Sequence, residues 1–156
     1  MTRCFLSLAL LLALGACSVP SEQPVAKKAA EPAARPADES RRFPMQDRVK
    51  VEIIEDHLLG NELLPPGNLA EYASGGKTYH MFLGEAKSGE AAALVMFDYK
   101  KTFTDSKLLP HMGGYYGMDA GQPVYIFVKG KWLAGIVGLE EAEADPLARE
   151  FAARLD

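Results

Sequence analysis

The chain has few cysteines, and this limits its chemistry. Of its 156 residues only Cys4 and Cys17 are cysteines, and Cys4 lies inside an apolar N-terminal run. If that run is removed as a signal, one thiol remains, which leaves no partner for a disulfide and too few thiolates for a zinc-thiolate site. The core of the folded part must therefore be held together by packing.

A basic stripe is also missing. Residues 45–156 contain eleven Lys/Arg against seventeen Asp/Glu, a net charge of −6, while residues 18–44 contain five against four. Because phosphate backbones repel an acidic domain, we expect no nucleic acid as a partner. Anionic lipid headgroups repel it too, so membrane binding requires an anchor.

The first sixteen residues have the three-part layout of a secretory signal peptide. Arg3 precedes the apolar run 5–14, which is followed by the small residues Gly15 and Ala16. The run is too short to span a membrane, since crossing about 30 Å of hydrocarbon takes roughly 20 residues. The sequence therefore predicts export.

The end of this signal is more specific. Leu14-Gly15-Ala16-Cys17 resembles the lipobox of bacterial lipoproteins, in which a leucine three positions before an invariant cysteine marks the cleavage site. The resemblance implies that Cys17 receives a diacylglycerol and, after cleavage, a further acyl chain, which anchors the protein stably to a membrane. Because Ser18 stands where an aspartate favours inner-membrane retention, the resemblance implies the outer membrane, facing the periplasm.

Residues 17–44 are interpreted as the lipidated cysteine and a disordered tether rich in proline and alanine. The segment 18–44 has five prolines, six alanines, no glycine and Phe43 as its single aromatic residue. So few large apolar groups cannot offset the entropy cost of ordering. We therefore expect one globular, monomeric domain over residues 45–156.

This domain is predicted to be α+β, a mainly antiparallel sheet with two helices packed against it. Two hairpins are predicted from apolar runs that flank glycine turns, 123–128 with 132–137 and 69–74 with 78–86. A terminal helix is predicted from Asp145 as its N-cap, Pro146 at its first position, and an apolar stripe of Leu147, Phe151 and Leu155.

Three other segments are less clear in the sequence. Residues 91–99 are compatible with a helix capped by Ser88 or with a strand, and the alanines favour the helix. Residues 47–59 are compatible with a strand or a helix, and we favour a strand over 49–53 that passes into a short helix. Residues 111–117 are predicted to form a strand.

No catalytic or metal signature is present. No serine lies in a Gly-x-Ser-x-Gly elbow, and His57, His80 and His111 are too far apart for a common zinc motif. We therefore expect a non-catalytic module without cofactor, metal or catalytic residue. The alternative is a small periplasmic enzyme or metal-binding protein in which His80 and His111 converge.

The aromatic residues indicate where such a module would bind. Tyr115, Tyr116 and Trp132 lie in predicted strands beside glycines, and large aromatic side chains dominate the energetics of interfaces. If exposed, they would form a face for an envelope protein or a small apolar ligand. The stretch 69–138 also resembles a group of uncharacterised exported bacterial domains in the motifs Leu69-x-x-Tyr72, Gly75-Gly76, Gly114-Tyr115-Tyr116 and Phe127-Val-Lys-Gly130. The resemblance supports the α+β prediction and the helix after Ser88, and it implies no activity.

Overall fold

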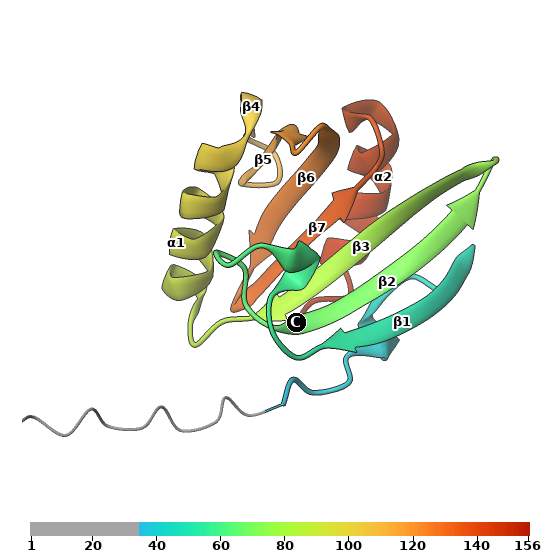
Figure 1. Ribbon diagram of the computed structural model, residues 1–156, viewed down its shortest axis with the longest axis horizontal. Helices are drawn as coiled ribbons and strands as arrows, with labels where there is room; N and C mark the ends of the chain where they lie inside the picture. The colour runs from blue at the N-terminus through green and yellow to red at the C-terminus, as the bar shows by residue number, and fades with distance from the viewer. Residues whose placement is uncertain (1–34) are drawn as a thin grey trace, which may run out of the picture. The chain divides into compact units, whose positions relative to one another are not determined.

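The computed structural model describes residues 35–156, so the predicted signal peptide, Cys17 and most of the predicted tether lie outside the described residues. Within residues 35–156, seven strands form one antiparallel sheet with two helices packed against it, which confirms the α+β prediction (Figure 1). Across the sheet the strands follow the order β1 (Arg48–Ile54), β2 (Gly67–Ser74), β3 (Lys77–Glu85), β7 (Trp132–Val137), β6 (Gln122–Lys129), β5 (Gly114–Asp119) and β4 (Thr104–Leu109). The helices are α1 (Gly89–Tyr99) and α2 (Glu141–Ala152), and short 3-10 helices cover Ser40–Arg42, Leu58–Gly60 and Lys100–Thr102.

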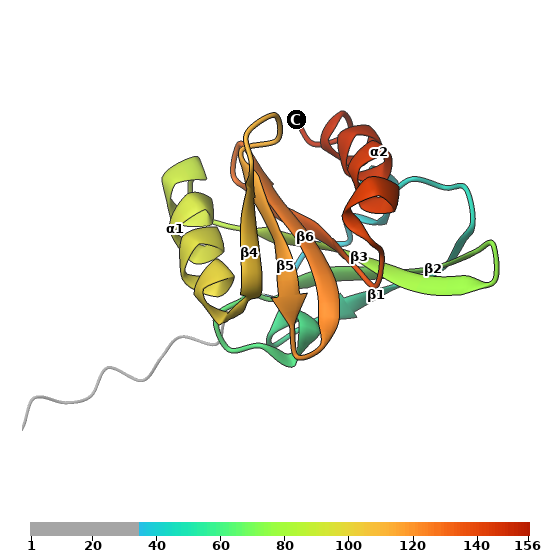
Figure 2. The ribbon, with the colours of Figure 1, turned by 90° about the horizontal axis from the view of Figure 1, so that it is seen from above.

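The helices cover opposite faces of the sheet (Figure 2). Along β6, Tyr125 and Phe127 belong to the cluster on the α2 side, whereas Val124 and Ile126 belong to the cluster on the α1 side. This alternation follows from the two-residue period of a strand. The central hairpin is apolar at nearly every position because both of its faces are covered.

Both predicted hairpins are confirmed. In the β2–β3 hairpin Ser74 pairs with Lys77, and the turn residues Gly75 and Gly76 have φ of +59° and +79°. In the β6–β7 hairpin Lys129 pairs with Trp132 across a turn whose Gly130 has φ of +56°. These positive φ angles are ones that glycine adopts without steric cost.

The alternatives that the sequence left open are now settled. Residues 89–99 form a helix, and the Ser88 hydroxyl accepts a hydrogen bond from the amide of Ala91 at 3.1 Å. The strand predicted over 49–53, passing into a short helix, is also confirmed, because strand β1 is followed by the 3-10 helix Leu58–Gly60. The strand predicted over 111–117 begins instead at Gly114, since residues 110–113 form the turn that joins β5 to β4, a strand that the sequence analysis missed.

The predicted N-cap of the terminal helix is wrong. The α2 helix begins at Glu141, and Pro146 lies inside it. The Glu140 carbonyl accepts hydrogen bonds from the amides of Glu143 and Ala144. Acidic side chains in the first turn also interact favourably with the positive end of the helix dipole. Asp145 therefore lies one turn into the helix, where its side chain is free to make contacts with other elements.

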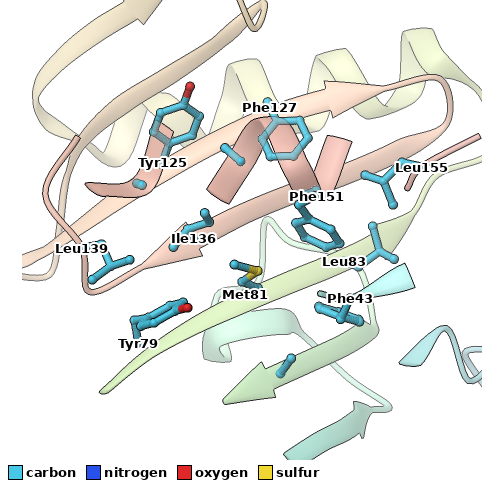
Figure 3. Close-up of a cluster of buried hydrophobic side chains, with 14 of the residues drawn as sticks. Phe43, Tyr79, Met81, Leu83, Tyr125, Phe127, Ile136, Leu139, Phe151 and Leu155 are labelled. Carbon is cyan, nitrogen blue, oxygen red and sulfur yellow. The ribbon is translucent and has the colours of Figure 1, made fainter. Parts of the chain in front are cut away.

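The predicted domain boundary at residue 45 is also too late. Residues 35–44, which we call the strap, pack on the domain, and Phe43 has none of its surface exposed. The centroid of its ring lies 5.0 Å from that of Phe151 on α2 (Figure 3). The Asn68 side chain, 2% exposed, donates to the Ala37 carbonyl and accepts from the Glu39 amide. The buried Phe43 ring and these hydrogen bonds therefore attach the strap to the domain.

Candidate functional site

The three predicted binding aromatics do not form one surface. Tyr115 and Tyr116 are consecutive in β5 and therefore point to opposite faces of the sheet. On the α1 side, the Lys100 ammonium lies 4.5 Å from the centre of the Tyr115 ring. On the α2 side, the Tyr116 hydroxyl donates to a Glu140 carboxylate oxygen at 3.0 Å.

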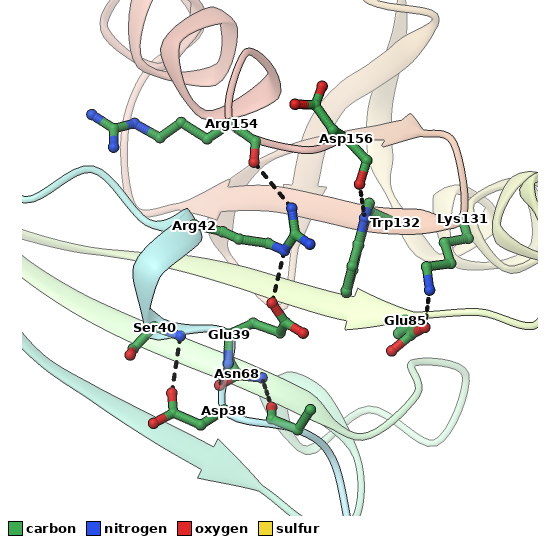
Figure 4. Close-up of polar contacts among 11 residues, drawn as sticks. Asp38, Glu39, Ser40, Arg42, Asn68, Glu85, Lys131, Trp132, Arg154 and Asp156 are labelled. Carbon is green, nitrogen blue, oxygen red and sulfur yellow. Dashed lines mark hydrogen bonds and ion pairs between the residues drawn. The ribbon is translucent and has the colours of Figure 1, made fainter.

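The third aromatic, Trp132, is 3% exposed and belongs to the core, so the prediction that it is available for binding is wrong. The Arg42 guanidinium of the strap lies 4.6 Å from the centre of its ring, and its indole N–H donates to the Asp156 carbonyl (Figure 4). Arg42 also donates to Glu39 and to the Arg154 carbonyl. Trp132 therefore joins the strap to the C-terminus.

The two histidines of the alternative hypothesis do not converge. His80 lines a cavity on the α1 side with Tyr99 and Val137, whereas His111 contacts Asp145 of α2 on the other side of the sheet. A site shared by His80 and His111 is therefore excluded. Among the described residues, no three His, Cys, Asp or Glu side chains are arranged to hold a metal ion.

Asp145 is the centre of a polar network that sequence analysis did not foresee. Its Oδ1 accepts from the Tyr125 hydroxyl at 2.7 Å and lies 2.5 Å from His111 Nε2, while its Oδ2 accepts from Arg149 Nε at 2.8 Å. The hydrogen bond from Arg149, followed by those from His111 and Tyr125, holds the pKa of Asp145 well below its usual range. Both oxygens of this carboxylate accept hydrogen bonds, and the one from Tyr125 links α2 to strand β6 of the sheet.

A cavity of about 370 Å³ lies between the outer end of the β2–β3 hairpin, α2 and residues 44–47, and we call it the hairpin cavity; the cavity beside His80 on the other face is of similar volume, about 390 Å³. A volume of this size is typical of small-molecule sites. Its walls combine aromatic, aliphatic and charged groups, among them Tyr72, Tyr79, Leu139, Leu147, Lys77 and Asp47.

Two stacked tyrosines of the core line the hairpin cavity, Tyr72 with none of its surface exposed and Tyr79 with 5%. Tyr72 and Tyr79 are cross-strand partners, and their ring centroids are 5.0 Å apart with an interplanar angle of 8°. The Tyr72 hydroxyl donates to the Pro44 carbonyl at 2.8 Å. The Tyr79 hydroxyl makes no hydrogen bond within residues 35–156, and burial, with the nearby charges of Asp47 and Glu150, raises its pKa. Since no side-chain oxygen of the described residues is both fully buried and unpaired, part of this hydroxyl is exposed and a ligand in the cavity can reach it.

The rim of the hairpin cavity is acidic. Glu143 pairs with Lys77 at 2.6 Å, which lowers the pKa of Glu143, and Glu150 pairs with Arg154 at 3.0 Å. Asp47 has no ion-pair partner in the described part of the chain. It lies in the left-handed region with φ of +59°, and its carbonyl accepts from the Ala73 amide. Aspartate tolerates this conformation, and residues held there often serve a function.

The fold of residues 35–156 is thus an antiparallel α+β sandwich of one sheet between two helices. A crystal structure of a GTP binding regulator from Thermotoga maritima is similar to it, with a TM-score of 0.53 and 12% sequence identity over 74% of this chain and 83% of the other. At this identity the similarity shows the fold alone. No family model and no curated protein matches the sequence.

In residues 35–156 no helix is both long enough and apolar enough to cross a membrane.

Proposed function

We propose that this chain is a lipid-anchored module of the bacterial envelope, without catalytic activity, that binds a small ligand with a cationic group on an apolar body. The observation that carries the proposal is the carboxylate of Asp47, which has no ion-pair partner within residues 35–156 and lines the hairpin cavity together with Tyr79. Leu147, which is only partly buried, and the exposed parts of Tyr79 and Leu139 supply apolar contact for the ligand body. Asp47 and the Tyr79 hydroxyl supply acceptors for an ammonium group.

The charge of the hairpin cavity selects against anions. Asp47, Glu143 and Glu150 line it against Lys77 alone, so a carboxylate or phosphate would meet net negative charge at close range. A nucleotide such as the GTP in the name of the structural neighbour is therefore disfavoured in this cavity. The same reasoning favours amines.

Substitution of Asp47 tests the proposal. The probe is phenethylamine, with 3-phenylpropionate as a ligand of similar size and opposite charge. In calorimetry, Asp47→Asn should weaken phenethylamine binding about tenfold, because a charge-assisted hydrogen bond contributes roughly 1.5–3 kcal/mol. Asparagine also tolerates positive φ, so the local backbone is preserved.

Asp105→Asn is the matched control for this measurement. Asp105 has φ of +56° and lies in the irregular part of β4, and it does not line the hairpin cavity. The control should bind phenethylamine like the wild type. Equal binding of the amine and the carboxylate, or an equal effect of both substitutions, would refute the proposed site.

The anchor is a separate part of the proposal and rests on the Leu14-Gly15-Ala16-Cys17 motif. Cells expressing the full chain should incorporate labelled palmitate into the protein, and Cys17→Ser should abolish the label. Because two or more acyl chains anchor stably, the labelled protein should also stay in the membrane fraction after a salt wash. Equal labelling of wild type and variant would contradict acylation at Cys17.

A further inference from the structure

The α1 side of the domain exposes an apolar strip that the fold does not use. Leu94 and Phe97, three residues apart on α1, are 66% and 47% exposed, and Leu108 on β4 is 54% exposed. Lys100 connects the two elements, since its ammonium lies 4.6 Å from the centre of the Phe97 ring and 4.5 Å from that of Tyr115. Tyr115 is the cross-strand partner of Leu108. Together these five residues form a continuous surface, here called the α1 strip.

Two lysines lie beside the α1 strip, and one exposed carboxylate, Glu90, lies one turn before Leu94 on the same face of α1. The ammonium groups of Lys100 and Lys101 both lie within 5 Å of the Phe97 ring centre. Asp98 pairs with Lys101 at 2.7 Å, whereas Lys100 has no ion-pair partner among the described residues. Apolar and aromatic groups with lysine ammonium groups over their rings match the interface of an anionic bilayer.

We infer that the α1 strip docks on the surface of the membrane that holds the lipid anchor, an inference that rests on the proposed acylation of Cys17. Two leucines and a phenylalanine bind a bilayer weakly on their own, but a tether raises their effective concentration to roughly millimolar. The chain from Cys17 to Arg35 extends at most about 60 Å, and a domain of this size has a radius of gyration of about 14 Å. Every face of the domain can therefore reach the bilayer.

This orientation has a consequence for the proposed ligand site. The hairpin cavity is lined by residues of the α2-side cluster, such as Tyr79 and Leu139, and therefore lies on the α2 side of the sheet. The α1 helix covers the other side (Figure 2). When the α1 strip rests on the headgroups, the hairpin cavity faces away from them and toward the periplasm. The acidic rim is then also far from the anionic lipids that would repel it.

Quenching by lipid tests the docking surface without relying on cellular acylation. The chain from residue 17 on has Cys17 as its single thiol, so it can be coupled there to a maleimide lipid in vesicles of phosphatidylethanolamine and phosphatidylglycerol. Phe97→Trp places a reporter on the α1 strip, and Val49→Trp places one at a site on β1 that is 58% exposed. Brominated acyl chains should quench Phe97→Trp at least about twofold more than Val49→Trp or the buried Trp132 of the wild type.

Further measurements separate this inference from its alternatives. Adding Leu94→Asp and Leu108→Asp to Phe97→Trp should reduce quenching to the level of Val49→Trp while the circular dichroism spectrum stays unchanged. Equal quenching at positions 97 and 49 would overturn the inference, and so would a dimer in sedimentation that buries position 97. Failure of palmitate labelling would instead contradict the anchor, because chemical coupling bypasses that step.

Discussion

Replacing Phe43 with alanine should destabilise the domain by about 3–5 kcal/mol, the usual cost of removing a buried phenylalanine ring. Phe43 is fully buried, and its ring packs against that of Phe151 on α2. A loss of this size is a large fraction of the 5–15 kcal/mol that stabilises a typical domain. Urea denaturation of residues 18–156, followed by circular dichroism, measures it directly.

Phe97→Ala is the matched control for this change. The same side chain is removed, but Phe97 is 47% exposed on α1, so the free energy of unfolding should fall by no more than about 1 kcal/mol. If Phe43→Ala cost no more than this control, the strap would not be part of the core and the domain would begin near residue 45, as the composition first indicated.

Replacing Asp145 with alanine should cost about 2–3 kcal/mol at neutral pH. The change removes the acceptor of hydrogen bonds from Tyr125 and Arg149 and the partner of His111. The residue Tyr125 is fully buried, and hydrogen bonds to charged groups contribute more than neutral ones. Asp98→Ala, which removes an exposed pair with Lys101, should change stability by about 0.5 kcal/mol or less.

The effect of Asp145 should depend on pH in one direction. Its pKa is lowered in the folded state by the hydrogen bond from Arg149 and then by those from His111 and Tyr125. The carboxylate therefore stabilises the fold fully above the unfolded pKa of about 3.9, and this stabilisation is lost as the pH falls through the lower folded pKa. Urea midpoints should show a smaller difference between wild type and Asp145→Ala at pH 2 than at pH 5. A difference that is as large at pH 2 as at pH 5 would contradict the network.

The hairpins could be predicted because their signals are local. A two-residue glycine turn determines the register of its two strands, and the alternation of side chains then assigns each residue to a face. The stacked tyrosines follow from the same rule, since Tyr72 and Tyr79 are equally far from the Gly75-Gly76 turn. The pairing of Tyr72 with Tyr79 could therefore be predicted from the sequence, although the residues predicted to bind were Tyr115, Tyr116 and Trp132.

The features that could not be predicted depend on contacts between distant segments. Phe43 stands alone in a segment rich in proline and alanine, and its burial requires α2, more than a hundred residues later in the chain. Asp145 followed by Pro146 is a pattern typical of a helix start. In the structure, however, α2 begins one turn earlier, after Glu140, and the Asp145 carboxylate accepts a hydrogen bond from Tyr125. In both cases tertiary packing outweighs the local signal.

Asp47 gave no distinctive signal in the sequence, as one of seventeen acidic residues in residues 45–156. Its significance comes from its position, because it lines the hairpin cavity, lacks an ion-pair partner within the described residues and holds a positive φ. An aspartate between the strap and a predicted strand could have suggested a turn. It could not have suggested that the turn faces two tyrosines of another hairpin.

A titration of methyl-labelled protein with phenethylamine, followed by NMR, tests the central claim most directly. Leu139 and Leu147 line the hairpin cavity, whereas Val124 and Val137 line the cavity on the opposite face, beside His80. The account predicts saturating shifts of the Leu139 and Leu147 methyls, with those of Val124 and Val137 unchanged. Saturating shifts confined to Val124 and Val137, or no saturating shift at Leu139 and Leu147, would contradict it.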